Sequence, residues 1–425
     1  MYDNQNIGNF LYNQNNMLHQ VTKLNWLYFD FDSYFASVEQ HLNIHLRNKP
    51  IAIVPLMTDS TCAIAASFEA KKFGIKTGTK IYEAKLLCKD LICVLARPSV
   101  YVEYHHLLLK EISKYLCIDY VFSIDEGACK LTGNQHDIDI AVSLAHQIKK
   151  ALKDNIGEHI TCSIGIAPNR YLAKIATSIV KPNGLTVIRP EDIPSKLFSL
   201  KVTNFPGIGR KVYERLRENN ITSVQNLYAL NVNQLYTAWG NIWGKRCWYL
   251  LRGVDLPLEE AKRSTIGQSK VIGPEQQEEK AARNIMLSLI LMATGRLRAK
   301  KLYTSRISLN LRTSSYAVYK KSIKVDVSND SLYLSKIALK SWDELVLLNK
   351  IKRIKKLAIS LNDLSFESTQ LSFFDNNDNQ KGTRVSQALD HLNEKFGKNA
   401  ISVGLIKLKK KEETPIAFGY IPDSK

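Results

Sequence analysis

Along residues 24–190, short apolar runs alternate with longer stretches that have helical spacing. The apolar runs predict strands at 24–31, 50–56, 61–67, 120–126 and 160–166. The helical spacing predicts helices at 32–41, 68–73, 101–116, 137–153 and 168–180. Because strands and helices interleave, we expect an α/β-type unit built around one sheet.

The second half of the chain has a different pattern. Residues 201–254 read as helical, and residues 255–263 are polar and read as a linker. Residues 264–364 predict a small layer of sheet and helices: a first strand, a helix at 275–299, strands at 302–312 and 320–327, a helix at 330–347 and a strand at 352–362. A polar stretch with one apolar island follows at 365–383, and a short helix is predicted at 385–396.

Composition indicates a folded protein of several domains. The chain has 425 residues, of which 45% are hydrophobic and 23% charged. No apolar run reaches the roughly 20 residues that span a bilayer. The first 20 residues are rich in Asn and Gln, do not resemble a signal peptide, and are interpreted as part of a flexible extension over 1–23. The seven cysteines stand singly, so we expect neither a zinc site nor disulfides, and we expect a cytoplasmic location.

Charge is concentrated in one part of the chain. The formal net charge is +19, of which residues 201–360 carry +17 and residues 1–200 carry +2. Such a segment favours a polyanionic partner, although a solubilising surface would also explain it.

Three acids follow apolar strands: Asp30, Asp125 and Glu126. Buried carboxylates are costly unless they are paired or bind metal, so we expect an acidic cluster that holds two Mg²⁺ ions. Neighbouring strand residues point to opposite faces, so Asp125 and Glu126 can act together only if the chain turns or bulges there, which Gly127 permits. The alternative is that these are exposed acids of ordinary turns.

A second motif lies in residues 205–216, where Gly207 and Gly209 precede a predicted helix that begins with Arg210 and Lys211. Backbone N–H groups at such a helix start can bind phosphate, and the pattern resembles a helix-hairpin-helix. A plain helix start is the alternative. Lys71 and Lys174 could likewise bind phosphate, or could lie on solvated helix faces.

Taken together, four segments resemble the Y-family translesion DNA polymerases of the polymerase IV type. These segments are residues 28–39, 123–126, 162–176 and 181–184, and their order and spacing match over about residues 24–364. The resemblance implies an α+β right-hand fold with a palm (24–33 and 97–181), fingers (34–96), a helix-hairpin-helix thumb (182–254), a linker (255–263), a little finger (264–364) and a C-terminal tail (365–425).

The resemblance also implies roles for individual residues. Asp30, Asp125 and Glu126 match the metal-binding carboxylates, and the backbone carbonyl of Phe31 matches a further ligand. Phe35 matches a steric gate that excludes a 2′-OH, although an aromatic ring there could also be a core residue. Lys174 matches a triphosphate contact.

The fingers depart from the family pattern. The family commonly has Thr, Tyr and Arg where this chain has Ala65, Phe68 and Lys71. Phe68 lacks a hydroxyl for a phosphate, and Lys71 keeps the charge but loses the planar fork of arginine. After Glu126 the family usually continues Ala-aromatic-Leu-Asp, which residues 127–130 do not. We therefore expect activity with weaker triphosphate binding or altered fidelity.

Two further features suggest macromolecular partners. Basic residues such as Arg263 and Arg298 could bind duplex phosphates on primer–template DNA. An apolar island in the polar tail is similar to the peptide by which bacterial polymerases bind the sliding clamp: Gln370, Leu371, Phe373 and Phe374. A strand packed back on the little finger is the alternative.

The sequence thus predicts a monomeric polymerase that adds deoxynucleotides to a primer 3′-OH with low fidelity. Two alternatives remain open. One is a catalytically weak relative that binds DNA and the clamp and recruits other factors, and the other is a helix-hairpin-helix nuclease or lyase.

Overall fold

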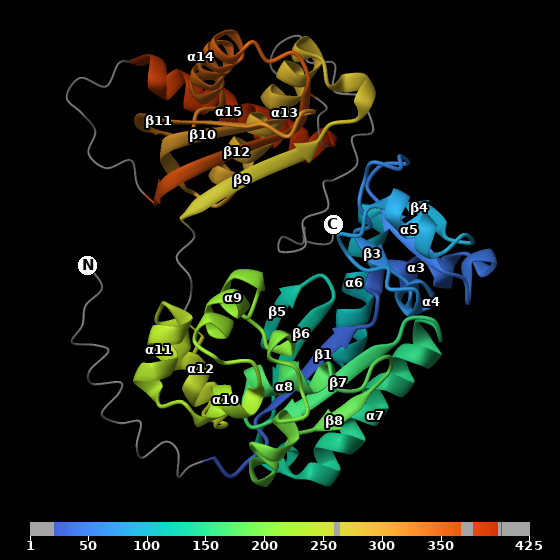
Figure 1. The fold of residues 1–425 in the computed structure, drawn as a ribbon. Coiled ribbons are helices and arrows are strands. Elements are labelled where there is room, and N and C mark those ends of the chain that lie inside the picture. The colour runs from blue at the N-terminus through green and yellow to red at the C-terminus, as the bar shows by residue number, and fades with distance from the viewer. Residues whose placement is uncertain (1–20, 259–263, 367–376, 398–400, 402–425) are drawn as a thin grey trace. The chain divides into compact units, whose positions relative to one another are not determined.

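The computed structural model describes residues 21–258, 264–366, 377–397 and 401. The chain divides into two compact units, and the division falls between Leu258 and Glu259 (Figure 1). The predicted linker, 255–263, contains this boundary. Val21 packs beside Gly253 in the first unit, so the predicted extension ends before residue 23.

The first unit is built on a five-stranded sheet of order β5-β6-β1-β7-β8. Its strands are β1 (Trp26–Phe31), β5 (Tyr120–Ser123), β6 (Glu126–Lys130), β7 (Cys162–Ala167) and β8 (Leu185–Val187). Every pair is antiparallel except β7 with β8. The predicted α/β character of residues 24–190 is therefore wrong: three of the four strand pairs are antiparallel, including the two that join β1 to strands distant in sequence, which gives an α+β arrangement.

Successive side chains of β1 point alternately into two different hydrophobic cores. Leu27, Phe29 and Phe31 pack with α6 (Pro98–Ile112) and α7 (Ile138–Asn155) on one face. Trp26 and Tyr28 face the opposite way. That second core contains α8 (Arg170–Thr177) and four further helices: α9 (Arg210–Glu218), α10 (Val224–Ala229), α11 (Val232–Trp239) and α12 (Trp243–Leu251).

The strands predicted at 50–56 and 61–67 do not join this sheet, which corrects the expectation of one sheet. They form a separate three-stranded sheet of order β3-β2-β4, with strands β2 (Ile51–Val54), β3 (Ala65–Ala66) and β4 (Ile92–Leu95). Three helices accompany them: α3 (Tyr34–Leu42), α4 (Phe68–Lys72) and α5 (Ile81–Leu87). A third, smaller core fills this subdomain.

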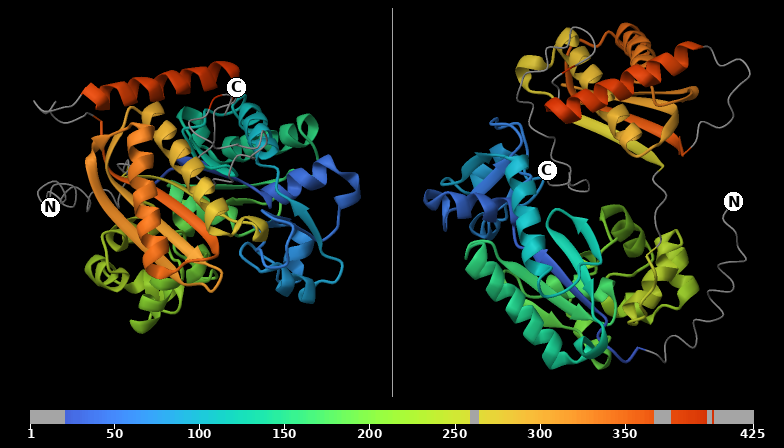
Figure 2. Two further views of the ribbon diagram at one scale, coloured as in Figure 1. Left: turned by 90° about the horizontal axis from the view of Figure 1, so that it is seen from above. Right: turned by 180° about the vertical axis from the view of Figure 1, so that it is seen from behind.

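The second unit is a four-stranded antiparallel sheet of order β11-β10-β12-β9. Its strands are β9 (Thr265–Val271), β10 (Tyr303–Thr313), β11 (Val318–Ser328) and β12 (Ile354–Ser365). The helices α13 (Glu279–Ala299) and α14 (Ser331–Asn349) cover one face of it, as both views in Figure 2 show. The pattern of strands and helices predicted for 264–364 is confirmed, and most boundaries differ from the predicted ones by one to four residues.

A further helix, α15 (Asn377–Phe396), packs on α14 and begins before the predicted residue 385. Arg298 at the end of α13 holds it in place. The Arg298 guanidinium donates to both carboxylate oxygens of Asp390, at 2.5 and 2.8 Å, and to Ser331 Oγ at 2.7 Å. Its side chain is only 8% exposed, so Arg298 stabilises this unit and is not available to bind DNA phosphates.

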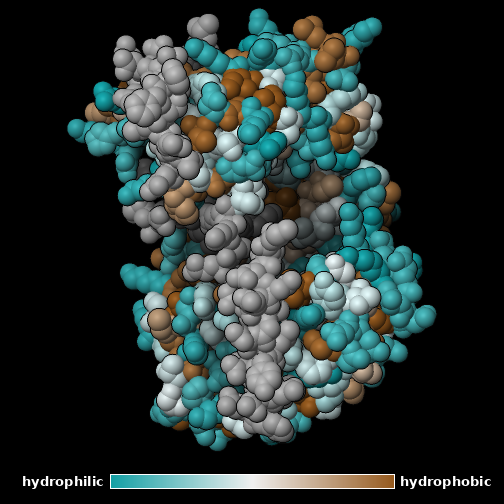
Figure 3. Space-filling view, turned by 90° about the vertical axis from the view of Figure 1, so that its left-hand side faces the viewer, coloured by the Kyte–Doolittle hydropathy of each residue, from teal (hydrophilic) through white to brown (hydrophobic). Residues whose placement is uncertain are grey.

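The surface is mainly polar. On the face seen in Figure 3, hydrophilic side chains dominate, and the hydrophobic ones lie in small separate patches. Among the residues described above, no helix combines the length and the apolar character needed to cross a bilayer.

Candidate active site

The three predicted acids come together at one end of the central sheet. Asp30 in β1 lies directly opposite Glu126 in β6, so both side chains point to the same face. Asp125 lies in the turn between β5 and β6 rather than in a strand. Asp30 and Glu126 lie near enough to Asp125 for their negative charges to raise the pKa of its carboxyl group. The turn required by the adjacency of Asp125 and Glu126 is therefore present.

Two hydrogen bonds hold that turn. The backbone N–H of Phe31 donates to the carbonyl of Asp125 at 2.7 Å, which ties the turn to the end of β1. On α6, Nδ1 of the buried His105 lies 2.7 Å from the carbonyl oxygen of Ile124. Burial lowers the pKa of His105, so its neutral ring, with the proton on Nδ1, would donate this bond near pH 7. Since the turn is fixed from both sides, Asp125 and Glu126 are held in place before any substrate binds.

Two lysines pair with the acids. Lys174 Nζ donates to Asp30 Oδ2 at 2.8 Å and also pairs with Glu126. Lys181 pairs with the other oxygen of Asp30. Burial by itself would raise the pKa of Asp30, but Lys174 and Lys181 outweigh it and hold that pKa below its usual value. Asp30 is therefore ionised at neutral pH.

Asp125 has a different environment. Ser123 Oγ donates to it at 2.5 Å, and burial, together with the charges of Asp30 and Glu126, raises its pKa above the usual value. Negative charge at this position is thus incompletely compensated by the protein. An all-oxygen set of this kind suits a hard divalent cation such as Mg²⁺.

The side chains are not yet arranged around one point. Among the residues that the structure describes, no three Asp, Glu, His or Cys side chains form a ready ligand set. The reason is visible in the contacts: Asp30 and Glu126 turn toward Lys174, and Asp125 turns toward Ser123. The chemistry of the donors nevertheless fits a metal, because three carboxylates at one end of the sheet are the oxygen ligands that a hard divalent cation takes.

Asp32, two residues after Asp30, is not part of this cluster of ligands. It is fully buried and accepts hydrogen bonds from Thr161 Oγ1, Ser163 Oγ and the backbone N–H of Asn183, at 3.0, 2.8 and 2.8 Å. Asp32 therefore fixes the 181–184 turn, and with it the position of Lys181. The sequence analysis included residues 181–184 in the family resemblance but assigned Lys181 no role. The feature that could have indicated one is a lysine in the turn that follows the helix carrying Lys174.

The three-stranded subdomain contributes a third lysine beside the acids. Lys71 Nζ donates to Ser33 Oγ at 2.6 Å and lies 4.8 Å from the ring centroid of Phe68. Burial, followed by the charge of Lys181, lowers the pKa of Lys71, while Asp32, Asp30 and Asp125 act in the opposite direction. Lys71 is thus held beside Ser33, with Phe68 next to it, and lies within electrostatic reach of Asp30 and Asp125.

Phe35 lies on the first turn of α3, close behind Asp30 and Phe31 in sequence. Its ring is almost completely buried and stacks on Tyr101, with centroids 4.4 Å apart and planes 15° from parallel. Tyr34 beside it donates from its hydroxyl to the carbonyl of Tyr101 at 2.5 Å. Phe35 is therefore a packed aromatic whose ring is held in position by Tyr101.

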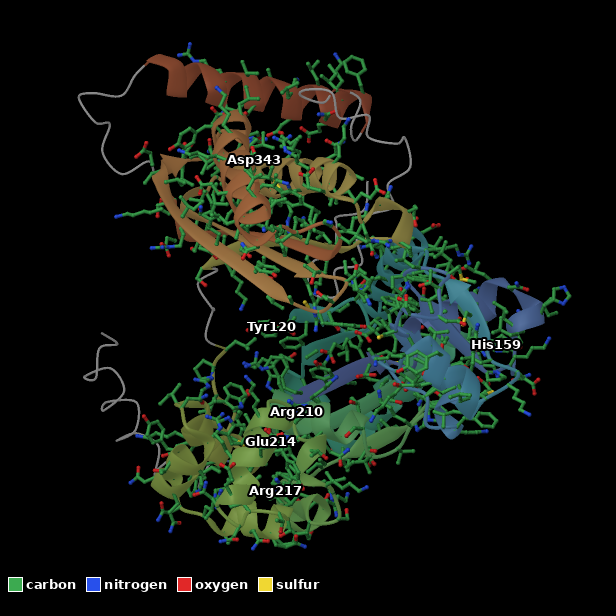
Figure 4. The ribbon with its side chains drawn as sticks, turned by 45° about the horizontal axis from the view of Figure 1, so that its top comes forward. Tyr120, His159, Arg210, Glu214, Arg217 and Asp343 are labelled. Atoms are coloured by element: carbon green, nitrogen blue, oxygen red, sulfur yellow. The ribbon has the colours of Figure 1, made fainter. Side chains whose placement is uncertain are left out.

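The predicted phosphate-binding turn is at the start of α9. Gly207 has a left-handed φ of +87°, and a Cβ there would lie 2.7 Å from Trp243 Nε1, so the position needs glycine. Gly209 is the N-cap of α9 and supplies no side-chain cap, which leaves the first N–H groups of the helix for a ligand. Figure 4 shows Arg210, Glu214 and Arg217 along this helix.

Several predicted residues cannot be compared with the structure. Arg263 and the four residues of the proposed clamp peptide lie outside the described residues. The peptide residues are Gln370, Leu371, Phe373 and Phe374.

Both halves of the chain match models of one protein family. Residues 29–178 match the impB/mucB/samB family, and residues 263–373 match the C-terminal domain of that family. DNA polymerase IV 1 of Bacillus subtilis (strain 168) is 26% identical over 393 residues, which cover 90% of this chain and 93% of that protein. DNA polymerase IV of Fusobacterium nucleatum subsp. nucleatum is 30% identical over 319 residues, covering 72% and 86%.

Solved structures agree with this result. A Y-family DNA polymerase chimera, Dbh-Dpo4(243-245)-Dbh, superposes with a TM-score of 0.69 at 25% identity, covering 81% of this chain and all of that one. An insertion ternary complex of Dbh DNA polymerase superposes with a TM-score of 0.54 at 26% identity and the same coverage.

Proposed function

Because this chain belongs to the impB/mucB/samB family of Y-family DNA polymerases, we propose that it extends primers on damaged templates through a two-metal site at Asp30, Asp125 and Glu126. The observation that supports this site is the meeting of the three carboxylates, on β1 and on the fixed β5–β6 turn, among three lysines. The reaction would join a deoxynucleoside monophosphate to the primer 3′-OH and release pyrophosphate.

The carboxylates would hold two Mg²⁺ ions, together with the backbone carbonyl of Phe31. When bound, such ions lower the pKa of the attacking hydroxyl and stabilise charge on the leaving group. The chain itself supplies the fixed turn that presents Asp125 and Glu126. Lys174 and Lys181 supply positive charge that keeps Asp30 ionised and ready to bind a cation.

Lys71, Lys174 and Lys181 form a group of cations around the acids and are proposed to bind the triphosphate. Lys174 and Lys181 would exchange their carboxylate partners for phosphate oxygens as metal and nucleotide enter. Lys71 is held by Ser33 and offers a point charge rather than the planar fork of arginine. Phe68 offers its ring but no hydroxyl, so nucleotide binding is expected to be weaker than with tyrosine at this position.

The polymerase assignment also carries a proposal for the parts of the hand. We propose the central sheet as the palm, the three-stranded subdomain over 34–96 as the fingers, the helices α9 to α12 as the core of the thumb, and the second unit as the little finger. The start of α9, with Gly207, Gly209, Arg210 and Lys211, would bind backbone phosphates without reading sequence.

The uncovered face of the sheet in the second unit is proposed as a further DNA contact. Its side chains point away from α13 and α14, and most of them are small, polar or basic. Five basic residues lie on this face: Arg306, Arg312, Lys320, Lys324 and Lys356. Arg306 pairs with Asp363 at 2.7 Å, but unlike Arg298 its side chain is 41% exposed. These five residues replace Arg298 in the proposed set of phosphate contacts, which also retains Arg263, and their contribution should weaken as salt rises.

Primer extension tests the function directly. The protein is incubated with Mg²⁺, all four deoxynucleotides and a labelled primer on an undamaged or an abasic template. Lengthened strands are expected on both templates, because the family acts in translesion synthesis. Shortened strands would instead indicate a nuclease, and DNA binding without incorporation at saturating nucleotide would favour a recruitment factor whose fingers no longer hold nucleotide.

The clamp peptide is a separate proposal that rests on sequence. Changing Gln370, Leu371, Phe373 and Phe374 to Ala is expected to abolish stimulation by a bacterial sliding clamp, while distributive synthesis stays at the wild-type rate. The measurement is product length per binding event, with and without clamp loaded on the template. Clamp-dependent processivity that persists in this variant would contradict the assignment.

A further inference from the structure

An aromatic strip lies on the edge of the central sheet and leads toward the acids. It consists of Trp26 and Tyr28 on β1 and Tyr120 and Phe122 on β5. Tyr120 lies opposite Ala128, which in turn lies opposite Tyr28, so these side chains share the face that carries Asp30 and Glu126. β5 forms one edge of the sheet, so no neighbouring strand covers the outer side of the strip.

The four rings form a continuous series of contacts that runs from Trp26 through Tyr120 and Phe122 to Tyr28. Ring centroids are 5.8 Å apart between Trp26 and Tyr120, 5.9 Å between Tyr120 and Phe122, and 5.6 Å between Phe122 and Tyr28. The inner rings of Trp26 and Tyr28 are buried, whereas Tyr120 and Phe122 are each 38% exposed. The inner pair therefore supports an outer pair whose surface remains open to a ligand.

Both ends of the strip are connected to charged groups. At the end near the acids, the Tyr28 hydroxyl hydrogen-bonds Glu126, and Lys174 Nζ lies 5.2 Å from the centre of the same ring. At the other end, the Arg170 guanidinium lies 4.9 Å from the Trp26 ring and 4.8 Å from the Tyr120 ring. The strip thus offers exposed aromatic surface between cations, a combination typical of surfaces that bind a nucleic acid strand.

The β5–β6 hairpin and α9 rise next to each other from the same end of the first unit, as Figures 1 and 2 show. Figure 4 labels Tyr120 on this side, together with Arg210 of α9. The strip therefore adjoins the proposed metal site through Tyr28 and lies on the side of the first unit that also carries the start of α9.

On this basis, and resting on the function proposed above, we propose that Tyr120 and Phe122 bind the primer strand next to its 3′ end. The pairing of β5 shifts register between Val121 and Ser123, and the rings of Tyr120 and Phe122 lie 5.9 Å apart on the side that Tyr28 occupies. The pair therefore spans more than one nucleotide step of about 3.4 Å in B-DNA. Each ring would contact the apolar face of a deoxyribose or a base edge. These contacts carry no sequence preference and would hold the primer terminus against the acids.

The first test measures primer–template affinity by fluorescence anisotropy at one fixed salt concentration and without nucleotide. Tyr120→Ala/Phe122→Ala is expected to raise Kd about 30-fold, the lower end of the range for the loss of two aromatic contacts to nucleic acid. The KM for deoxynucleotide at saturating DNA should not change. Tyr120→Phe/Phe122→Tyr should restore affinity, and the matched control Tyr82→Ala/Leu86→Ala, an exposed pair on α5, should bind as the wild type.

A second test uses the wild-type protein and so avoids any loss of folding in the variants. 5-Iododeoxyuridine is placed at the last or the penultimate primer position, or at the paired template position, and irradiated. Cross-links from the primer to the peptide that contains residues 120–122 are expected. Cross-links only from the template, only to other peptides, or an unchanged Kd in the alanine variant would overturn the proposal.

The two tests separate this inference from the function on which it rests, because neither requires catalysis. If the protein cross-links through residues 120–122 but never extends primers, the proposed primer contact is supported and the polymerase assignment is contradicted. If the protein extends primers but the alanine variant binds DNA as the wild type does, only the proposed primer contact is contradicted.

Discussion

Replacing Asp125 and Glu126 together by alanine should abolish primer extension, with a fall in rate of at least about 1000-fold, because the ions these side chains hold supply several kcal/mol of transition-state stabilisation. The measurement is single-turnover extension with Mg²⁺ at saturating DNA and nucleotide. Affinity for primer–template should change little, since the proposed DNA contacts lie on α9, on β5 and in the second unit.

The same substitutions should not unfold the protein. Burial and neighbouring charges raise the pKa of Asp125, so its ionised form destabilises the fold at neutral pH, and its removal relieves that cost. Removal of Glu126 leaves Lys174 paired with Asp30 at 2.8 Å. The midpoint of thermal unfolding is therefore expected to stay at or above that of the wild type.

A matched control uses two exposed acids near the end of α7. Asp154→Ala/Glu158→Ala removes the same charge from the same unit but away from the acidic cluster, and it should extend primers normally. If the Asp125→Ala/Glu126→Ala variant were as active as this control, the reaction would not depend on the cluster, and the polymerase site would have to lie elsewhere.

Local sequence patterns were sufficient where burial determines the pattern of an element. Continuous apolar runs predicted β1 and β7 because both faces of these strands are buried. The alternating pattern over 264–364 predicted the second unit because one face of its sheet packs on helices. The pairing of strands could not be predicted in this way. The strands β2 and β3 have the apolar character of central strands, yet they form their own sheet, because pairing depends on contacts between residues distant in sequence.

The acidic cluster shows the same limit. The sequence indicated that Asp125 and Glu126 need a turn to act together, but not that Phe31 and His105 hold that turn. Both bonds join elements far apart in the chain. Lys181 was missed because a lysine in a turn is usually solvated, and only the burial of Asp32 beneath the turn brings it to Asp30.

Arg298, unlike Lys181, was given a binding role that its position in the structure does not allow. A basic cluster at a helix end was interpreted as a DNA contact, because charge alone does not distinguish a ligand-binding arginine from one that pairs within the protein. Its partner, Asp390, lies on α15 and within the helix predicted at 385–396, but the packing of that helix against the rest of the second unit could not be predicted from local sequence. The distribution of charge predicted a polyanion-binding segment, but it did not identify which of its residues face outward.

Phe35→Ala is expected to admit ribonucleotides. The ring follows Asp30 closely in the chain and is held by Tyr101 at 4.4 Å, so it cannot move aside for a 2′-OH. Removing it should lower the preference for deoxynucleotides over ribonucleotides between about 10- and 200-fold, the range over which a small steric difference is discriminated. The measurement is the ratio of kcat/KM for the two sugars on the same primer–template.

Folding must be separated from sugar selection in this test. Loss of a buried Phe costs about 3–5 kcal/mol of stability, so thermal unfolding is recorded for every variant, and Phe35→Leu serves as a milder change that opens part of the same space. Tyr34→Phe is the matched control, because it removes the 2.5 Å hydrogen bond to the Tyr101 carbonyl beside the gate and keeps every ring.

Sugar preference should fall in the order Tyr34→Phe, Phe35→Leu, Phe35→Ala, with Tyr34→Phe equal to the wild type. This order follows from the space that each side chain leaves beneath the sugar. The ratio of the two kcat/KM values does not depend on overall activity, because a structural defect would lower kcat/KM for both sugars alike. If a folded Phe35→Ala variant rejected ribonucleotides as strongly as the wild type, Phe35 would be a core aromatic that packs on Tyr101, and another group near the acids would have to select the sugar.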